Sequence, residues 1–159
     1  MLDYSRLGLK AGLEIHQQID SKTKMFCRCP TNIRDDAADI IVKRRLRASA
    51  GEAGTVDVAA AYEQVRGKHF IYHAYNDSVC SVELDEEPIH DLSEEALTIC
   101  LQTALMLKAK IVDRIRVMRK TVVDGSNTSG FQRTAFVAGN GSIEPLSGKV
   151  GIASVCIEE

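Results

Sequence analysis

Short runs in which apolar and polar residues alternate recur along the chain, and they constrain its fold more than any other feature. Such runs predict strands at residues 7–19, 68–76, 115–123, 131–138, 142–145 and 149–159. A Gly139-Asn140-Gly141 turn is expected to join the runs before and after it. Because strands outnumber helices and several are separated by short turns, the sequence predicts an α+β fold with antiparallel pairing.

Helical periodicity is clearest between Ser93 and Lys110. Ser93 can cap the helix, and the acidic residues of the first turn and the basic residues of the last suit the helix dipole. The residues expected on the packed side are Leu97, Leu101, Ala104, Leu105 and Lys108, with Cys100 beside them as a small apolar filler. A shorter helix is expected within residues 56–65.

The size and charge of the chain exclude several classes of protein. Its 159 residues suffice for one core but not for two full-sized domains. The net charge of -2 argues against a DNA-binding domain, so any nucleic acid contact must come from a local patch. No apolar run approaches the roughly 20 residues of a membrane helix, and the first ten residues lack the apolar stretch of a signal peptide. We therefore expect a soluble, cytoplasmic protein without a membrane partner.

Glu14 and His16 are two positions apart in the first predicted strand, so their side chains share one face. Leu13 and Ile15 belong to the opposite, core-like face. A carboxylate beside a neutral imidazole suits Mg²⁺ or Mn²⁺, with water and phosphate oxygens as further ligands. The alternative is a solvated strand face that binds nothing.

Five cysteines occur without a secretory signal, so a disulfide framework is not expected. Cys27 and Cys29 belong to a Cys-x-Cys-Pro turn, and Cys80 lies far downstream. Three thiolates can hold zinc, with Glu83 or His90 as a candidate fourth ligand. Reduced, buried thiols are the alternative, and the spacing does not decide between the two.

The last predicted strand ends with two acids, Glu158 and Glu159. Strict alternation places Glu159 on the face of Ile157 and Glu158 on the face of Cys156. Either acid could join Glu14 and His16 if the two strands are neighbours, or both could belong to a frayed end. The abrupt end of the chain favours a fragment of a longer protein.

A polar, glycine-bounded loop separates two apolar strands between Arg119 and Arg133. Loops held by rigid flanks concentrate binding groups, and hydroxyl, amide and guanidinium groups recognise phosphate and carboxylate. An ordinary surface turn is the alternative. The basic run at 43–47 could contact an RNA backbone, although a solvated face is the commoner reason for such a run. The sequence contains no Walker phosphate loop, no dinucleotide-binding glycine motif and no nucleophile elbow.

Five segments, in order, resemble the N-terminal part of the E-type subunit of archaeal glutamyl-tRNA(Gln) amidotransferases and, more distantly, the bacterial B-type subunit. They are GLEIHQQID, KMFCRCP, VELDEEP, VMRKTVVDGSNTSGFQRT and VGIASVCIEE. The resemblance spans essentially the whole chain. It implies a cradle-shaped domain similar to glutamine synthetase and guanido kinases, built around an antiparallel sheet, of which residues 1–159 would form the N-terminal part.

The resemblance also implies an enzyme, a ligase that forms a carbon–nitrogen bond. It would use ATP to phosphorylate the γ-carboxyl of glutamate misacylated on tRNA(Gln), and ammonia would then displace the phosphate to give Gln-tRNA(Gln). The ammonia would come from an asparaginase-like amidohydrolase, the D-type subunit, within a hetero-oligomer. ATP and Mg²⁺ are the implied cofactors, with Zn²⁺ as a further candidate.

The family motifs match particular residues of this chain. The resemblance assigns magnesium to Glu14, His16 and Glu159. The residues that match its substrate pocket, with catalytic roles that we infer, are Arg119, Lys120, Ser126 and Gln132. Some B-type proteins carry a Cys-x-Cys and a Cys-x-x-Cys pair, whereas the second pair here would be Cys80 and Glu83, so a fourth thiolate is missing.

A function of another class stays open at this point. The alternative is a non-catalytic zinc-binding scaffold or a tRNA-contacting module, supported by the cysteines and by the basic run at 43–47. The isolated chain is expected to be inactive, because the rest of the cradle, the tRNA-binding tail and the ammonia-supplying partner lie elsewhere.

Overall fold

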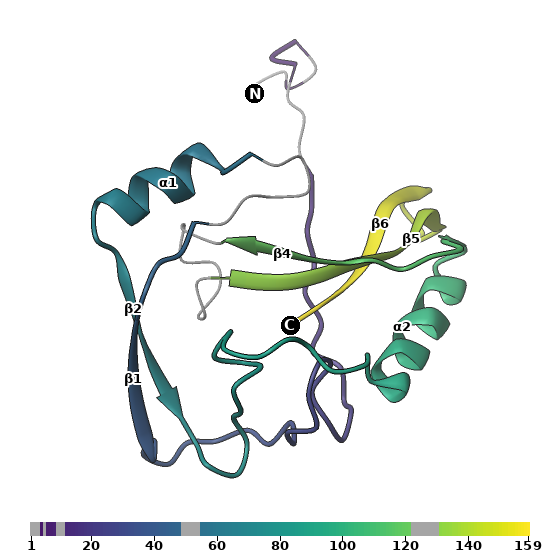
Figure 1. Cartoon of the computed structure of the whole chain (residues 1–159). Coiled ribbons are helices and arrows are strands. Elements are labelled where there is room, and N and C mark those ends of the chain that lie inside the picture. Colours follow the sequence, from purple (N-terminus) through teal and green to yellow (C-terminus); the bar gives the residue numbers. More distant parts are fainter. Residues whose placement is uncertain (1–3, 5, 9–11, 49–54, 122–130) are drawn as a thin grey trace.

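The structure, a computed structural model, describes the chain except residues 1–3, 5, 9–11, 49–54 and 122–130 (Figure 1). Its elements are β1 (Ile40–Arg45), α1 (Val58–Val65), β2 (His69–Ala74), α2 (Glu94–Met106), β3 (Lys110–Ile111), β4 (Val117–Thr121), β5 (Phe131–Ile143) and β6 (Val150–Glu158). Every strand pairing among the described residues is antiparallel, so the predicted α+β class is confirmed.

The main sheet is organised around β5. Along one edge β5 pairs with β4 and then β3, and along its other edge it pairs with β6. The core lies against this sheet, where Ala135, Val137 and Ile157 pack with Phe26 and Val82. Phe26 and Val82 belong to non-helical segments, so the core fixes two loops as well as the sheet. Both loops reach the candidate sites.

Helix α2 confirms the predicted cap and part of the predicted packed side, since Ala104 is buried and Leu101 packs against the core. The Ser93 side chain accepts a hydrogen bond from the Ala96 backbone N–H. The buried helical residues are Ala96, Cys100 and Ala104, so Cys100 is core filler as predicted. Leu105, predicted to be packed, is 62% exposed. Small side chains bring the helix close to β5 and β6, and the larger Leu105 is left at the rim.

The predicted Gly139-Asn140-Gly141 turn is wrong, because residues 131–143 form the single strand β5. These glycines allow neighbouring groups to pack closely against the strand. A Cβ at Gly141 would lie 2.7 Å from the Leu107 carbonyl oxygen, and one at Gly139 would lie 2.9 Å from the Phe136 ring. Asn140 between them has a φ of 56°, a value that asparagine tolerates better than most residues. The sequence Gly-Asn-Gly is therefore compatible both with a turn and with a strand that is closely packed by its neighbours.

The strand predicted at residues 7–19 is wrong over 12–19, the part of it that the structure describes without a gap. This segment is extended but has no ladder with another strand. Leu13 is 88% and Ile15 is 80% exposed, so neither faces the core as predicted, and only Ile19 packs against it. Alternation of apolar and polar residues predicts an extended segment with two different faces. A β-strand also requires hydrogen bonds to a neighbouring strand, and this segment has none with the described strands.

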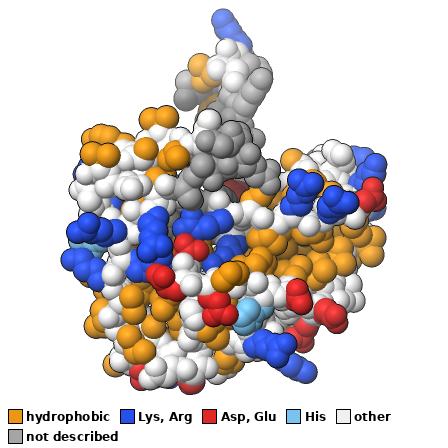
Figure 2. Space-filling model, in the orientation of Figure 1, with side chains coloured by type: hydrophobic (Ala, Val, Ile, Leu, Met, Phe, Trp, Pro, Cys, Tyr) orange, Lys and Arg blue, Asp and Glu red, His pale blue; other side chains and the backbone are white. Residues whose placement is uncertain are grey.

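The hairpin β1–β2, connected through α1, forms a second, two-stranded sheet beside the main one (Figure 1). The predictions of α1 and of β2 are confirmed. On the face seen in Figure 2, Lys and Arg side chains gather over the upper half of this hairpin and in the space toward β4. Among the described helices, neither is long and apolar enough to cross a membrane.

Candidate functional site

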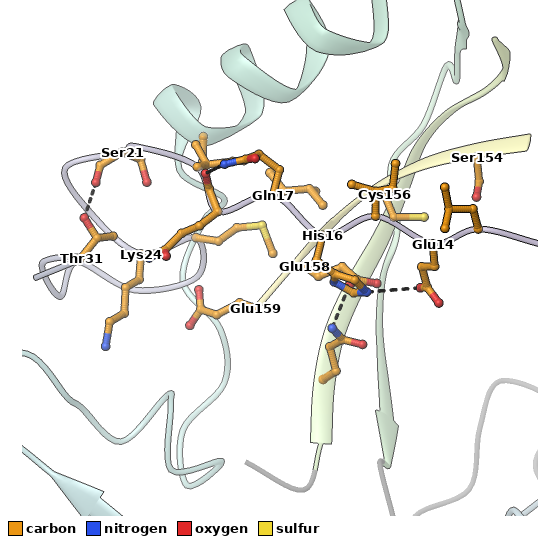
Figure 3. A pocket seen from close by; sticks show the side chains of 18 residues that line it. Glu14, His16, Gln17, Ser21, Lys24, Thr31, Ser154, Cys156, Glu158 and Glu159 are labelled. Carbon is orange, nitrogen blue, oxygen red and sulfur yellow. Dashed lines mark hydrogen bonds and ion pairs between the residues drawn. The ribbon is translucent and has the colours of Figure 1, made fainter. Parts of the chain in front are cut away.

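A cavity of about 570 Å³ lies between the extended N-terminal segment and the end of β6 (Figure 3). Two parts of the chain that are far apart in sequence supply its polar groups. Glu14 and His16 come from the N-terminal segment, and Glu158 and Glu159 come from the end of β6. The cavity also contains Lys24, Gln132 and Ser154 in its lining.

His16 lies between two carboxylates. Its Nε2 is 3.6 Å from Glu14 Oε1, and its Nδ1 is 3.7 Å from Glu158 Oε2. Gln132 Nε2 donates to Glu158 Oε2 at 2.7 Å, and Thr134 Oγ1 donates to Glu158 Oε1 at 2.8 Å. These two donors from β5 fix the Glu158 carboxylate, so β5 and β6 together hold the acid that faces His16.

Glu159 occupies the more buried end of the cavity. One of its carboxylate oxygens accepts a hydrogen bond from the Phe26 backbone N–H at 3.0 Å. The other oxygen is buried and has no hydrogen-bond partner among the described residues. Burial raises the pKa of the Glu159 carboxyl above its ordinary value, and the nearby Glu83 carboxylate adds to this effect. A buried carboxyl oxygen without a protein donor has room for a cation, a water or its own proton as its partner.

The donor set of the cavity fits a hard divalent cation. It consists mainly of carboxylate oxygens with one imidazole, and Mg²⁺ prefers oxygen ligands supplemented by water. The predicted trio of Glu14, His16 and Glu159 lines this one cavity. Within the described chain, however, these three do not bring one ligand atom each within 4.8 Å of one another. Glu158, rather than Glu159, is the acid beside His16.

Three cysteines and one glutamate form a second cluster. One ligand atom from each of Cys27, Cys29, Cys80 and Glu83 lies within 4.8 Å of the others. The Cys27 thiol donates to Glu83 Oε1 at 3.5 Å. Of the two residues considered as a fourth ligand, the structure brings Glu83 to the cysteines, whereas His90 pairs with Glu87.

Burial favours the protonated form of the Cys27 and Cys29 thiols. Burial raises the pKa of Cys29 to about 11, and burial also raises the pKa of Cys27 well above its ordinary value. Lys24 forms an ion pair with the second oxygen of Glu83 and donates to the Ser78 carbonyl at 2.6 Å. Cysteine thiolates and a glutamate carboxylate are both zinc ligands, and the four groups match the number of ligands in a tetrahedral site. Zinc would displace the thiol protons.

The residues predicted from the loop at 119–133 separate into two places. Gln132 lines the large cavity. Arg119 instead pairs with Asp85 at 2.8 Å and stacks on the Phe131 ring, in a smaller cavity next to the hairpin. Lys120 lies opposite Gln132 in the β4–β5 register, and Ser126 lies outside the described residues. Because side chains alternate along a strand, Gln132 faces the opposite side of the sheet from its neighbours Phe131 and Arg133.

Sequence reasoning missed three residues that organise these sites, namely Lys24, Asp85 and Thr134. Lys24 and Asp85 belong to KMFCRCP and VELDEEP, two of the strings that carry the family resemblance. Their presence in those strings is the signal that could have found them. Thr134 ends a third such string, VMRKTVVDGSNTSGFQRT, so the same signal could have found it.

Comparison with known proteins adds to this geometry. Residues 9–159 match the model of the GatB/GatE catalytic domain. The chain belongs to this family. As a GatB/GatE catalytic domain it is 57% identical over 158 residues to the E subunit of the glutamyl-tRNA(Gln) amidotransferase of Methanocaldococcus jannaschii. It is 56% identical over 158 residues to the protein of the same name from Methanosarcina acetivorans. Each alignment covers 99% of this chain and 25% of the relative, so the chain spans about a quarter of the length of these proteins.

The comparisons confirm the resemblance to the archaeal E-type proteins. They support membership of a tRNA-dependent amidotransferase family. All five segments that carry the resemblance fall within the residues that match the GatB/GatE domain.

Proposed function

We propose that residues 1–159 form the N-terminal part of a cytoplasmic, cradle-shaped catalytic domain that amidates Glu-tRNA(Gln). The cradle would resemble glutamine synthetase and guanido kinases. In the first step the γ-carboxylate of the glutamyl group takes the terminal phosphoryl group of ATP, and ADP leaves. In the second step ammonia attacks the acyl carbon, the carbon–oxygen bond to phosphate breaks, and Gln-tRNA(Gln) and inorganic phosphate result.

The observation that carries this proposal is the single cavity that gathers Glu14, His16, Glu158 and Glu159. Family membership supports it as well, because these residues fall within the matched domain. A phosphoryl transfer between two anions needs a site that neutralises their charge and fixes their positions. A cavity lined by acids can do this only together with cations, so the acids support a metal-dependent reaction.

Glu14, His16 and Glu159 would hold Mg²⁺, which supplies charge neutralisation when bound. The chain's own residues orient the two acids at the end of β6 that border this site. Gln132 and Thr134 fix Glu158 beside His16, and the Phe26 backbone N–H fixes one oxygen of Glu159. Lys24 brings a positive charge to the cavity wall. Arg119, Lys120 and Ser126 remain proposed substrate-pocket residues from the family motif.

The proposed partners follow from the names of the relatives. These are subunits of glutamyl-tRNA(Gln) amidotransferases, so a hetero-oligomer with other subunits and a tRNA substrate is the expected assembly. We assign the ammonia supply to an asparaginase-like amidohydrolase, the D-type subunit. The isolated chain, a quarter of the length of its relatives, is expected to be inactive.

We also propose that Cys27, Cys29, Cys80 and Glu83 hold a zinc ion, because the structure gathers these four ligands within 4.8 Å. The role of this zinc is structural. It joins the Cys-x-Cys turn to the segment before α2, and the same turn carries Phe26, whose backbone holds Glu159. This zinc site therefore supports the catalytic cavity, and it does not require a separate scaffold function.

The test is Glu14→Ala in the complete enzyme. Loss of one proposed magnesium ligand should reduce ATP-dependent formation of Gln-tRNA(Gln) by at least a hundredfold, since metal neutralisation is a principal stabilising term in phosphoryl transfer. Amide hydrolysis by the partner subunit should be unaffected. Glu144→Ala, at an exposed acid outside the cavity, is the matched control and should retain full activity. Near-normal amidation by Glu14→Ala would refute the metal assignment.

A further inference from the structure

The outer face of the β1–β2 hairpin carries cations and no acids. It consists of the exposed side chains of Ile41, Lys43 and Arg45 on β1 and of His69, Ile71 and His73 on β2. The register pairs these residues across the hairpin, so all six lie on one face. Arg47, just beyond β1, is exposed as well.

The inner face of the hairpin packs against the main domain, whereas the side chains of the outer face are exposed. Arg44 pairs with Glu86 at 3.2 Å, and its side chain is only 10% exposed. Phe70 and Tyr72 line the small cavity next to Arg119, and Arg45 and Arg47, at and just beyond the end of β1, also contribute to its lining. The inner residues therefore attach the hairpin to the main domain. In the part of the chain that the structure describes, no acid pairs with Lys43, Arg45 or Arg47.

We propose that this outer face binds the phosphate backbone of RNA. Lys43 and Arg45 are about 6.8 Å apart along the strand, as i and i+2 residues of a strand are, and together with Arg47 they form a row of cations. Such a row suits a repeating anion rather than a single one. Phosphate contacts by Lys and Arg provide most of the affinity in protein–nucleic acid binding.

The other residues of the face also suit RNA. His69 and His73 are aromatic groups of the kind that stack on unpaired bases or contact the sugar. Ile41 and Ile71, 67% and 59% exposed, add apolar contact area between the cations. A protein partner would need acids opposite Lys43 and Arg45, or it would bury their charges at a cost. Charge complementarity therefore favours RNA.

The inference rests on the proposed function for the identity of the RNA, which would be the tRNA substrate. It assigns to the hairpin a positioning role, because the hairpin lies outside the cavity that holds Glu14 and His16. The hairpin would hold the body of the tRNA while the acceptor end reaches the cavity.

The experiment uses the complete subunit with a tRNA(Gln) transcript, and binding is measured by fluorescence anisotropy at several salt concentrations. The double variant K43Q/R45Q should bind at least fivefold more weakly. The slope of log K against log salt should become shallower by about 1.4 to 1.8, the value for two lost phosphate contacts at 0.7 to 0.9 each. The variant K43R/R45K should retain binding, since phosphate accepts either cation.

The matched control is K108Q/K149Q, which removes two charges from exposed lysines elsewhere in the described chain. Its affinity and salt slope should equal those of the unchanged protein. Equal affinity and slope for K43Q/R45Q would overturn the inference. Protection of Lys43 from an acylating reagent in the RNA-free protein would also overturn it, because another segment would then cover the face.

Failure of this inference and failure of the proposed function would differ. K43Q/R45Q should raise the KM for tRNA and leave kcat unchanged. An enzyme that binds tRNA through the hairpin but never amidates it contradicts the proposed function alone. If the enzyme is active and K43Q/R45Q binds tRNA as tightly as the unchanged protein, only this inference is contradicted.

Discussion

Glu83 connects the two proposed metal sites at the scale of single residues. One oxygen of its carboxylate accepts from Cys27 at 3.5 Å, and the other pairs with Lys24, whose side chain also lines the large cavity. A metal held by the first oxygen would leave the second with Lys24. The lysine then offsets the negative charge of three thiolates and a carboxylate, as partners of metal ligands commonly do.

The zinc assignment predicts that Glu83→Ala weakens zinc binding at least tenfold, because three thiolates then hold the ion with an open position. Glu83→Cys should restore or increase affinity by completing a four-thiolate set. His90→Ala is the control and should bind zinc normally, since His90 lies outside the cluster. Competition with a chromophoric chelator measures each affinity.

Removal of zinc by a strong chelator should also lower the free energy of unfolding by several kcal/mol, since ligation joins distant segments. The assignment would be contradicted if the purified protein contained much less than one equivalent of zinc and if the chelator left its thermal midpoint unchanged.

The sequence named Cys27, Cys29 and Cys80 as zinc candidates, and the structure brings these three together, but the spacing alone left reduced thiols open. The sequence was not sufficient to choose between Glu83 and His90. Both lie within ten residues of Cys80, and the choice depends on how the turn after Cys80 folds back on itself. That turn is stabilised by hydrogen bonds such as Glu83 N–H to the Cys80 carbonyl at 3.1 Å, which no periodicity reports.

Strand β5 is the element on which the sheet depends, since β3, β4 and β6 all pair with it. Its two glycines allow α2 and the following turn to approach closely. Gly141 packs under the Leu107 carbonyl, which accepts a hydrogen bond from the Ser142 N–H at 2.7 Å. The strand therefore joins the sheet to the C-terminal end of the helix.

This packing predicts that Gly141→Ala destabilises the protein by about 1–3 kcal/mol, the usual cost of overpacking. The added Cβ would meet a backbone oxygen at 2.7 Å, which a side-chain rotation cannot relieve. Gly151→Ala on the neighbouring strand β6 is the matched control, because a Cβ there meets nothing within 4 Å. Urea unfolding of both variants compares the two costs, and equal midpoints would contradict the prediction.

At the element scale, periodicity predicted α2, β2, β4 and β6 because each buries one face against a neighbour in the same structure. It failed at residues 12–19, where the alternation is present but the partner edge is not. It failed again at Gly139 and Gly141, where glycine marks crowding by Phe136 and Leu107 rather than a turn. Both failures arise from contacts between distant segments.

Asp85 contributes to the whole molecule by fixing the segment before α2 to the main sheet. It pairs with Arg119 of β4 and with Arg133 of β5, and both guanidinium groups stack on the Phe131 ring. The Arg133 side chain is only 6% exposed, so its charge depends on this acid and on the Val82 carbonyl. Asp85 itself has a φ of 58°, in the left-handed region.

We predict that Asp85→Asn lowers the free energy of unfolding by roughly 2–4 kcal/mol, because it leaves a buried guanidinium without its counter-charge. Asparagine tolerates the left-handed backbone, so the loss reports charge rather than strain. Glu144→Gln, at an acid that is 60% exposed and pairs with a similarly exposed lysine, is the control and should change stability by less than about 0.5 kcal/mol. Thermal or urea unfolding distinguishes the two, and a neutral Asp85→Asn would refute the role of the ion pairs.

The position of β6 in the sheet has a consequence for synthesis on the ribosome. The Phe26 backbone N–H donates a hydrogen bond to the carboxylate of Glu159, which is synthesised 133 residues later. The cavity therefore cannot close while the chain is still growing through α2 and β5, and Glu14 and His16 emerge long before their partners. Contacts of such high sequence separation form slowly. Until β6 leaves the exit tunnel, an exposed edge of β5 is available for wrong pairing, and a chaperone that shields this edge should raise the yield of folded protein.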